Sequence, residues 1–459
     1  MYKMRINKFI LAAVFVILSG GCISQSNTGW EQADKILSRV KAPQFPAKDF
    51  MITDYGATGD GKTNCTQAIN KAISAANKAG GGRVVVPPGT FLTGVIYLKS
   101  NVNLYISQDA VVKFSTDPNQ YLPAVFTRWE GVECMNYSPL IYAYKEKNIA
   151  VTGKGTLDGQ GSFDNWWKWT KVLQGKDRKE LFAQGQAGVL VRKRLYGGKY
   201  LRPTMLEPYK CRNILIEGIK IINSPFWHIH PVLSQNIIVR NVTVDGMGPN
   251  NDGCNPESCK DVLIEGCLFN TGDDCIAIKS GRNNDTRRVN VPSENIVIRN
   301  CLMKAGHGGV AIGSEITGGA RNIFVEKCTM DDPNLDRAIR LKTNSVRGGF
   351  IENVFVRDIT VGQVKEAVLL IDFFYQDIEK GNFKPIVRNI NMENVTSKKS
   401  QYALFLRGFD DAPITDVSLK NCTLDNVTNP DVISNVKNLV LENVKINGKL
   451  ASADGVDAD

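Results

Sequence analysis

The chain has 459 residues, 43% of them hydrophobic, and a formal net charge of +10. This hydrophobic content suffices for a large core and excludes a disordered chain, while the length allows one large domain or two to three ordinary ones. The positive charge favours an anionic partner, but the sequence contains no basic helix or aromatic–basic motif typical of nucleic-acid binding. We therefore expect no nucleic-acid partner and consider an acidic polysaccharide the better candidate.

Residues 1–21 have the features of a secretory signal. A basic start is followed by an apolar run from Phe9 to Leu18, which is too short to span a membrane as a stable helix. No later apolar stretch is long enough to cross a bilayer. We expect an exported protein without membrane-spanning segments.

Cys22 follows the sequence LSGG, which resembles a bacterial lipoprotein cleavage box. We expect lipidation of Cys22, a tether over residues 22–48, and a periplasmic or outer-membrane-anchored protein of a Gram-negative bacterium. The membrane contact would then be the lipid anchor alone. The alternative is an ordinary signal peptide, cleaved between Ser19 and Cys22.

Residues 63–78 predict an amphipathic helix. Its apolar residues fall on one helical face and are Ala68, Ile69, Ala72, Ile73 and Ala76. Such a helix is suited to cover the open end of a stack of repeats.

A repeated unit occupies the rest of the chain. Each unit contains two short strands with alternating apolar residues, and an Asn or Asp precedes it. The units read NILIEGIKI, NIIVRNVTV, DVLIEGCLF, NIVIRNCLM, NIFVEKCTM, NVFVRDITV, NINMENVTS, DVSLKNCTL and NLVLENVKI, starting at Asn213, Asn236, Asp261, Asn295, Asn322, Asn353, Asn389, Asp416 and Asn438. Earlier coils are indicated at Asn101 and Asn148.

Strand pairs that recur at the intervals between these start residues indicate a solenoid. The alternation of apolar residues with a period of two excludes helical repeats. We predict an all-β protein: a single-stranded, right-handed parallel β-helix with an N-terminal capping helix, each coil rising about 4.8 Å. The β-helix is expected over residues 49–447 as one domain, followed by a tail over residues 448–459.

The repeat explains most of the eleven cysteines. Four of them end repeat units in a position that other units fill with Ile or Val, namely Cys267, Cys301, Cys328 and Cys422. A position shared by Cys, Ile and Val is a core position. We expect mostly reduced, buried thiols, with Cys254 and Cys259 the pair least certain to follow this rule.

The repeat is interrupted at about residues 162–206 by an insertion that contains Trp166, Trp167, Trp169 and many basic residues. Insertions in a solenoid gather on one face, often the binding face. The tryptophans could stack on sugars, or they could simply stabilise a surface flap.

Ionisable residues take matching places on successive coils. Asp273 and His307 each lie 12 residues after a repeat start, and Asp252 precedes Asp273 by one coil. One coil later, Arg340 and Lys342 share one face of a strand; Asp274 adjoins Asp273. Each residue alone has an ordinary structural explanation, but their register across four coils predicts a site.

Closely spaced carboxylates repel one another, so at least one of them binds a proton more tightly. Glycosidic cleavage uses a protonated acid to protonate the leaving oxygen and a second carboxylate to activate water. An arginine and a lysine on the same face can bind the carboxylate of a uronic acid.

Four ordered motifs resemble glycoside hydrolase family 28, the polygalacturonases. They are NND at Asn250–Asp252, GDD at Gly272–Asp274, GHG at Gly306–Gly308 and RLK at Arg340–Lys342. The segment from Asp49, DYGATGDGKTN, also resembles an N-terminal signature of related β-helix proteins, so that the resemblance extends to Asn447.

The resemblance implies metal-free, inverting hydrolysis of α-1,4-galacturonosyl bonds in an acidic pectic polysaccharide or oligogalacturonide, without a cofactor. We expect the protein to be a monomer. Asp273 would be the general acid, and Asp252 and Asp274 would hold and deprotonate the water, with carboxyl separations of about 6.5–9.5 Å. His307 would tune Asp273. Substrate binding would fall to Arg340, Lys342, Asn250 and a downstream tyrosine, for which Tyr375 is the best match.

Asn251 stands where many endo-acting members carry threonine, so exo action is favoured, and the insertion could close one end of the groove. Endo action remains the alternative. Two rivals share the fold: a calcium-dependent pectate lyase, which the cations Arg340 and Lys342 disfavour, and a non-catalytic pectin-binding β-helix, which would not need three carboxylates in register.

Overall fold

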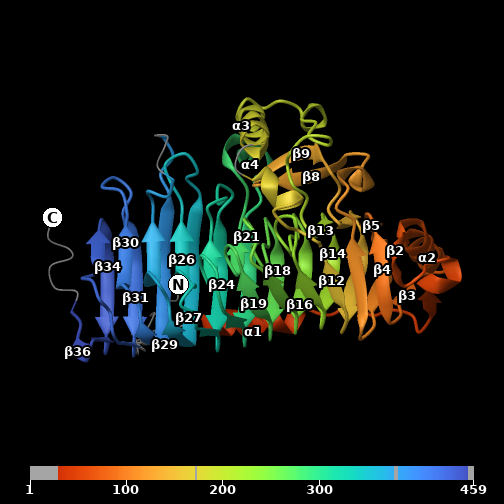
Figure 1. Ribbon diagram of the computed structural model, residues 1–459. Coiled ribbons are helices and arrows are strands. Elements are labelled where there is room, and N and C mark those ends of the chain that lie inside the picture. Colours follow the sequence, from red (N-terminus) through yellow and green to blue (C-terminus); the bar gives the residue numbers. More distant parts are fainter. Residues whose placement is uncertain (1–28, 171–172, 377–380, 453–459) are drawn as a thin grey trace, which may run out of the picture.

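The computed structural model describes residues 29–170, 173–376 and 381–452, and it confirms the predicted right-handed parallel β-helix. Consecutive coils stack along one axis, with α2 at one end and the C-terminal coils at the other (Figure 1). All pairings between stacked coils are parallel, as the register of the repeat units requires.

Each coil contributes strands to rows that run the length of the molecule. The first row contains β1 (Asp49–Met51), β3 (Gly82–Val86), β6 (Val102–Ile106), β11 (Lys147–Gly153), β14 (Arg212–Glu217), β16 (Gln235–Arg240), β18 (Lys260–Glu265), β21 (Ser293–Arg299), β24 (Ala320–Glu326), β27 (Phe350–Gln363), β29 (Ile386–Lys399), β31 (Ile414–Lys420) and β34 (Val436–Glu442). The second row contains β2 (Asp60–Asn64), β4 (Gly89–Thr93), β7 (Ala110–Phe114), β12 (Thr156–Asp158), β15 (Lys220–Ile222), β17 (Thr243–Gly246), β19 (Leu268–Thr271), β22 (Leu302–Met303), β25 (Thr329–Met330), the ends of β27 and β29, β32 (Thr423–Leu424) and β35 (Lys445–Ile446), which pairs with β36 (Lys449–Leu450).

The third row carries the ionisable residues singled out in the sequence. It consists of β5 (Ile96–Tyr97), β10 (Ile141–Tyr144), β13 (Leu206–Tyr209), β20 (Ile276–Ile278), β23 (Val310–Ile312), β26 (Arg337–Lys342), β28 (Ala367–Asp372), β30 (Tyr402–Arg407) and β33 (Val432–Ser434). Single bridges at Ile229, Cys254 and Ile276 continue this row between β13 and β20.

The Asn or Asp at each repeat start takes a left-handed backbone conformation, for example φ of 59° at Asn213 and 60° at Asn295. Asn and Asp tolerate this conformation better than other residues with a side chain. The side chains also form a ladder between coils: Asn322 donates to Asn295 at 3.0 Å, and Asn353 donates to Asn322 at 3.1 Å. These two roles explain why the repeat begins with Asn or Asp.

The repeat's Cys/Ile/Val position is buried in the core, as predicted: Cys267, Cys301, Cys328 and Cys422 are at most 3% exposed. All ten cysteines of the described residues, including Cys254 and Cys259, are free and buried. Burial raises the pKa of the Cys254 thiol well above its ordinary value, which favours an inert, neutral side chain.

Helix α2 (Thr66–Lys78) caps the N-terminal end of the β-helix, as predicted. Its apolar face is fully buried in the main core, with Ile69 and Ile73 at 0% exposure. The helix therefore covers apolar side chains that would otherwise meet water at the open end of the stack.

The segment expected to be a plain tether, residues 22–48, instead contains helix α1 (Trp30–Arg39). Its residues Ala33 and Ile36 pack on outward-facing side chains of several coils, among them Leu263 and Phe324. Arg39 forms an ion pair with Asp261 at 2.7 Å. The apolar spacing of this short helix was not recognised in the sequence; α1 lies along the lower face of the β-helix in Figure 1.

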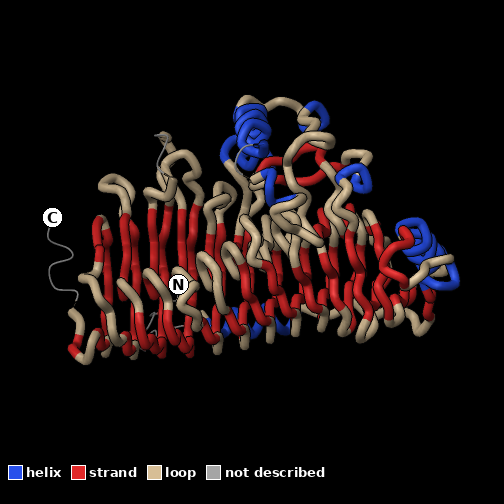
Figure 2. Tube along the Cα trace, viewed as in Figure 1, coloured by secondary structure: helices blue, strands red, loops and turns tan. Residues whose placement is uncertain are grey.

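The insertion within residues 162–206 rises from the opposite face and includes helix α3 (Leu173–Gln186). A second excursion, the antiparallel hairpin of β8 (Val125–Trp129) and β9 (Val132–Asn136), was not predicted. The short helix α4 (Asn283–Val289) lies beside them. In Figure 2, α3 and α4 stand above the β-helix, on the side away from α1.

No helix among the described residues is long and apolar enough to cross a membrane. Cys22, the predicted lipidation site, lies outside the described residues, as does the signal-like segment.

Candidate active site

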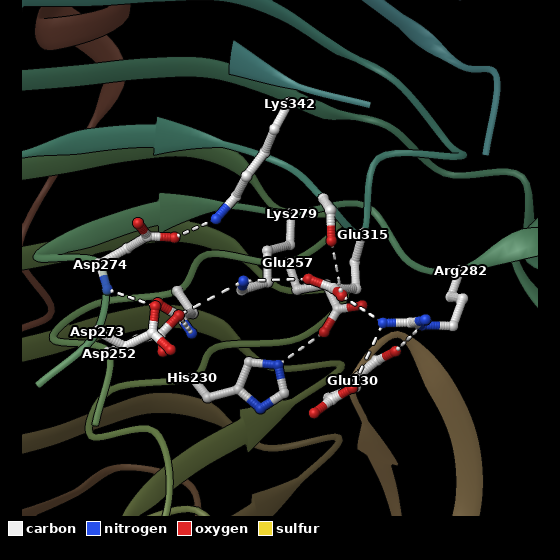
Figure 3. A network of polar contacts seen from close by, with 12 residues as sticks. Glu130, His230, Asp252, Glu257, Asp273, Asp274, Lys279, Arg282, Glu315 and Lys342 are labelled. Atoms are coloured by element: carbon white, nitrogen blue, oxygen red, sulfur yellow. Dashed lines mark hydrogen bonds and ion pairs between the residues drawn. The ribbon is translucent and has the colours of Figure 1, made fainter. Parts of the chain in front are cut away.

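The predicted site residues lie on four consecutive coils. Asp252 shortly precedes the bridged Cys254, Asp273 and Asp274 precede β20, His307 precedes β23, and Arg340 and Lys342 lie in β26. The strand register aligns Ile276 with Val310, which puts Asp273 opposite His307, as their spacing predicts. The structure brings these side chains together on one face, and Figure 3 shows Asp252, Asp273, Asp274 and Lys342.

The adjacent aspartates differ in their surroundings. Asp273 lies at the mouth of the site with its side chain 20% exposed, and its Oδ1 is 3.0 Å from Nδ1 of His307. Asp274 lies beneath it with its side chain 1% exposed. The backbone N–H of Asp274 donates to Oδ1 of Asp273 at 2.9 Å, which fixes the Asp273 carboxylate relative to the backbone.

Two cations hold Asp274. Lys342 Nζ lies 2.6 Å from its Oδ2, and Arg340 Nη1 lies 3.2 Å from its Oδ1. Burial alone would raise the pKa of Asp274, but Lys342, Arg340 and the nearby Lys279 outweigh it and hold the pKa well below its ordinary value. Asp274 is therefore a permanent anion.

Asp252 is buried in a different environment. Its Oδ2 accepts a hydrogen bond from Asn255 at 2.9 Å and lies 3.4 Å from Nζ of Lys279. Burial, followed by the neighbouring Asp273 carboxylate, raises the pKa of Asp252 well above its ordinary value, although Lys279 opposes this rise. Asp252 therefore binds a proton more tightly than an ordinary aspartate does.

One oxygen of each carboxylate, Asp252, Asp273 and Asp274, lies within 4.8 Å of the others. These nearest oxygens lie closer than 6.5 Å, whereas the predicted separation of about 6.5–9.5 Å refers to whole carboxyl groups and stays a prediction. The registered coils bring the carboxylates this close, and buried cations from neighbouring strands stabilise them against mutual repulsion.

These three carboxylates could in principle hold a metal ion. However, Ca²⁺ takes six to eight oxygen ligands, and Lys279, Arg340 and Lys342 already contact Asp252 and Asp274. The donor set does not fit a hard cation, because the positive charges occupy the positions beside the oxygens.

His307 stands at the rim of the site, with its side chain 51% exposed. Its hydrogen bond with Asp273 raises its pKa above the ordinary value, and burial opposes this rise. The imidazole is therefore protonated at mildly acidic pH and can donate to Asp273.

The remaining predicted residues line the same cavity. The ring of Tyr375 faces Arg340 and Lys342 at 5.3 Å and 5.2 Å. Asn250 also lines it, and Arg202 donates to its Oδ1 at 2.7 Å. Asn251 is fully buried and donates to the backbone oxygens of Ser224 and Phe226, so this residue can affect the substrate only indirectly.

The insertion's tryptophans do not form a sugar platform. Trp166 is 1% exposed and Trp169 is 7% exposed, and both belong to the main core. Trp167 is half-buried and donates from Nε1 to the backbone oxygen of Ser224 at 2.9 Å. The structure therefore favours the alternative of a segment stabilised by its own aromatics.

A chain of alternating charges forms a wall of the cavity and was missed in the sequence. Arg178 of α3 and Arg282 contact Glu130, at 2.8 Å and 3.4 Å. Arg282 also contacts Glu315 at 2.6 Å, and Glu315 contacts Lys279 at 3.1 Å. Glu130 lies in the turn between β8 and β9, so the hairpin and the insertion meet at this wall.

The sequence contained a signal for two of these residues. Lys279 directly follows β20, at the far end of that strand from the aspartates, and Glu315 follows β23 after two intervening residues, at the far end of that strand from His307. The sequence contained no signal for Glu130 and Arg178, because their contact depends on how two irregular segments fold over the β-helix.

Comparison with known proteins agrees with this geometry. The family model described as "Glycosyl hydrolases family 28" matches residues 80–447, and "Rhamnogalacturonase A/epimerase, pectate lyase-like" matches residues 50–107. A "Probable polygalacturonase" of Vitis vinifera is 30% identical over 434 residues, covering 90% of this chain and 81% of the relative.

An "Exo-poly-alpha-D-galacturonosidase" of Dickeya chrysanthemi is 26% identical and covers 71% of this chain and 57% of that protein. Among solved structures, an exopolygalacturonase from Thermotoga maritima is 42% identical with a TM-score of 0.89. The alignment covers 92% of this chain and 96% of that one.

Proposed function

The chain belongs to family 28 of the glycosyl hydrolases, and we propose that it hydrolyses the α-1,4-galacturonosidic bonds of polygalacturonan and pectin. One observation carries this proposal: three carboxylates with oxygens within 4.8 Å of one another lie beside Arg340 and Lys342 in one cavity. Such a site can cleave a glycosidic bond and bind the carboxylate of a uronic acid.

Asp273 is the general acid of this proposal. It is the most accessible of the three carboxylates, and its backbone and side chain both contact His307. In its protonated form it donates to the oxygen of the leaving sugar, which departs as a neutral alcohol.

Asp252 and Asp274 hold and deprotonate the water that attacks the anomeric carbon. Attack from the face opposite the leaving oxygen inverts the anomeric configuration. The short separation supports a water held between two members of a cluster, rather than in the wide gap of a two-carboxylate site.

The substrate carboxylate is bound by the two cations of β26. Arg340 carries five N–H donors, and Asp274 occupies one of them, so others are available to a galacturonate group. Tyr375 packs against both cations and adds an aromatic edge to the binding surface, while Asn250 adds an amide to the lining of the cavity.

Exo action is the proposed mode. A wall of charged side chains borders the cavity where a long polymer would otherwise continue; it consists of Glu130, Arg178, Arg282 and Glu315. The names of the Dickeya chrysanthemi relative and the Thermotoga maritima structure support the same mode.

The test is product analysis on de-esterified polygalacturonic acid in the presence of EDTA, with the Asp273→Asn variant as the inactive control. Galacturonate monomer from the earliest times is expected, without a rise in the absorbance of an unsaturated product. A ladder of oligomers would overturn the exo mode, and activity that requires calcium and forms an alkene would overturn hydrolysis.

We further propose export by the N-terminal signal and lipid attachment at Cys22, with the catalytic domain as a monomer. Labelling with a fatty-acid analogue tests this: wild-type protein is expected to incorporate the label, and Cys22→Ala is not. Label retained in Cys22→Ala would contradict the assignment.

A further inference from the structure

Lys279 is a buried cation that none of the proposed catalytic steps uses. Its side chain is 4% exposed, and its Nζ lies 3.4 Å from Oδ2 of Asp252 and 3.1 Å from Oε2 of Glu315. The ammonium also lies over the indole of Trp227, 4.6 Å from the ring centroid. These contacts, from three different coils, fix the amine beside Asp252 (Figure 3).

The contacts leave the two oxygens of Asp252 unequal. Oδ2 accepts a hydrogen bond from Asn255 and lies beside the ammonium group of Lys279. Among the residues that the structure describes, none donates a hydrogen bond to Oδ1. Oδ1 is therefore the oxygen able to accept a proton from water, provided that Asp252 is ionised when the substrate arrives.

Asp274 does not compete for a proton, because Lys342 and Arg340 occupy its two oxygens. A proton for the leaving oxygen must therefore come from one of the other two carboxyl groups. Only one arrangement is productive, with the proton on Asp273 and Asp252 ionised, since the reverse leaves neither an acid at the leaving oxygen nor a base at the water.

We propose that Lys279 is a positioning residue that opposes protonation of Asp252 and so favours the arrangement in which Asp273 carries the proton. The proposal rests on the hydrolytic function proposed above and extends it to a residue outside the recognised motifs. A fixed positive charge 3.4 Å from Asp252 favours the ionised form of that carboxylate over the neutral form.

The acidic groups around Lys279 favour its protonated form. Asp252, Asp273, Asp274 and Glu315 all stabilise its positive charge and raise its pKa against the effect of burial. Glu315 competes with Asp252 for the positive charge of Lys279. Arg282 also contacts Glu315, at 2.6 Å, and thereby weakens this competition. The amine consequently stays charged across the working pH range and can act on Asp252 throughout it.

The experiment compares wild type, Lys279→Met and Lys279→Arg by kcat and KM across pH on a galacturonate oligomer. Methionine keeps the length of the side chain and removes its charge. The acid limb of kcat/KM reports ionisation of the base in the free enzyme. We expect this limb to move to higher pH by about one unit in Lys279→Met, so that activity below the limb falls about tenfold while KM changes little. Lys279→Arg should keep the wild-type limb.

An unchanged limb with a raised KM would overturn the proposal and make Lys279 a substrate-binding group. An equal shift in Lys279→Arg would overturn it too, because packing rather than charge would be responsible. A wild-type protein without hydrolytic activity would instead overturn the proposed function.

Should Lys279→Met fail to fold, Glu315→Gln supplies the opposite change. Without the competing carboxylate, Lys279 can turn fully to Asp252, and the acid limb should move to lower pH. A limb that stays in place or rises would contradict the proposal.

Discussion

Lys342 donates from Nζ to Oδ2 of Asp274 at 2.6 Å, and both side chains are at most 5% exposed. This contact assigns a second task to a residue that the sequence predicts as a ligand of the substrate carboxylate. It holds Asp274 in the ionised state, so the proton for the leaving oxygen must come from another carboxyl group.

Lys342→Met should therefore affect the chemical step as well as binding. Loss of the ammonium allows the pKa of Asp274 to rise, because burial then acts with less opposition. We expect a fall in kcat of about 10²-fold and an acid limb at higher pH, measured by steady-state kinetics across pH. Lys342→Arg is the matched control, and a change in KM alone would contradict the dual role.

Asp273→Asn should abolish turnover and preserve binding. The amide has nearly the same shape and can still accept the N–H of Asp274, but it cannot supply a proton to the leaving oxygen. A loss of about 10²–10⁴-fold in kcat is expected, together with nearly unchanged binding of a galacturonate trimer by calorimetry. Activity within a few fold of wild type would remove Asp273 from the role of acid.

His307 should set the alkaline limb of activity. Its hydrogen bond with Asp273 raises its pKa above the ordinary value of 6.5, so the imidazolium persists to higher pH in the folded protein than in the unfolded chain. As the pH rises through this folded-state pKa, the positive charge beside Asp273 is lost and kcat should fall. His307→Gln, which cannot titrate, should flatten that limb; a limb that is retained in the variant belongs to another group.

The reaction should proceed with inversion although the carboxylates lie close together. Proton NMR during early turnover of an oligogalacturonide identifies the anomer that forms first. The β anomer is expected from an α-linked substrate, followed by slow mutarotation. Initial formation of the α anomer would indicate a covalent intermediate, and one of the carboxylates would then be a nucleophile.

The solenoid and the catalytic register could be predicted because both follow from local, repeated chemistry. The Asn or Asp that starts each unit needs a left-handed φ, and the strand alternation buries Cys267 and its equivalents. These features align the coils with one another. Asp273 and His307 are 34 residues apart, as are the paired residues Ile276 and Val310 of the strands that follow them, so the two side chains lie opposite each other.

The cavity wall could not be predicted in the same way, because its contacts join parts of the chain that do not repeat. Glu130 meets Arg178 across 48 residues and Arg282 across 152. The role of the tryptophans stayed open between two alternatives for a related reason: composition cannot distinguish an aromatic that faces a sugar from one such as Trp166 that fills the core.

A second buried ionic cluster surrounds His230. Nε2 of His230 is 2.7 Å from Glu257, both labelled in Figure 3, and Nδ1 is 3.2 Å from Glu207; these three side chains are at most 1% exposed. Glu257 also lies 3.3 Å from Arg128. Arg128 belongs to β8 and stands two residues before Glu130. A protonated His230 thus separates two carboxylates and supports the hairpin that reaches the active site.

The stability of the protein should consequently depend on the charge of His230. Burial lowers its pKa, but the hydrogen bonds and charges of Glu207 and Glu257 outweigh burial and raise the pKa above 6.5. This stabilisation is fully present below the unfolded value of 6.5 and is lost as the pH rises through the folded-state pKa. His230→Gln should therefore cost about 3–5 kcal/mol at pH 5.5, because two buried carboxylates lose the charge between them, and less at pH 9. Urea unfolding at both pH values measures the difference, with the surface variant Arg83→Gln as control. An equal cost at both pH values would mean that His230 acts through its shape alone.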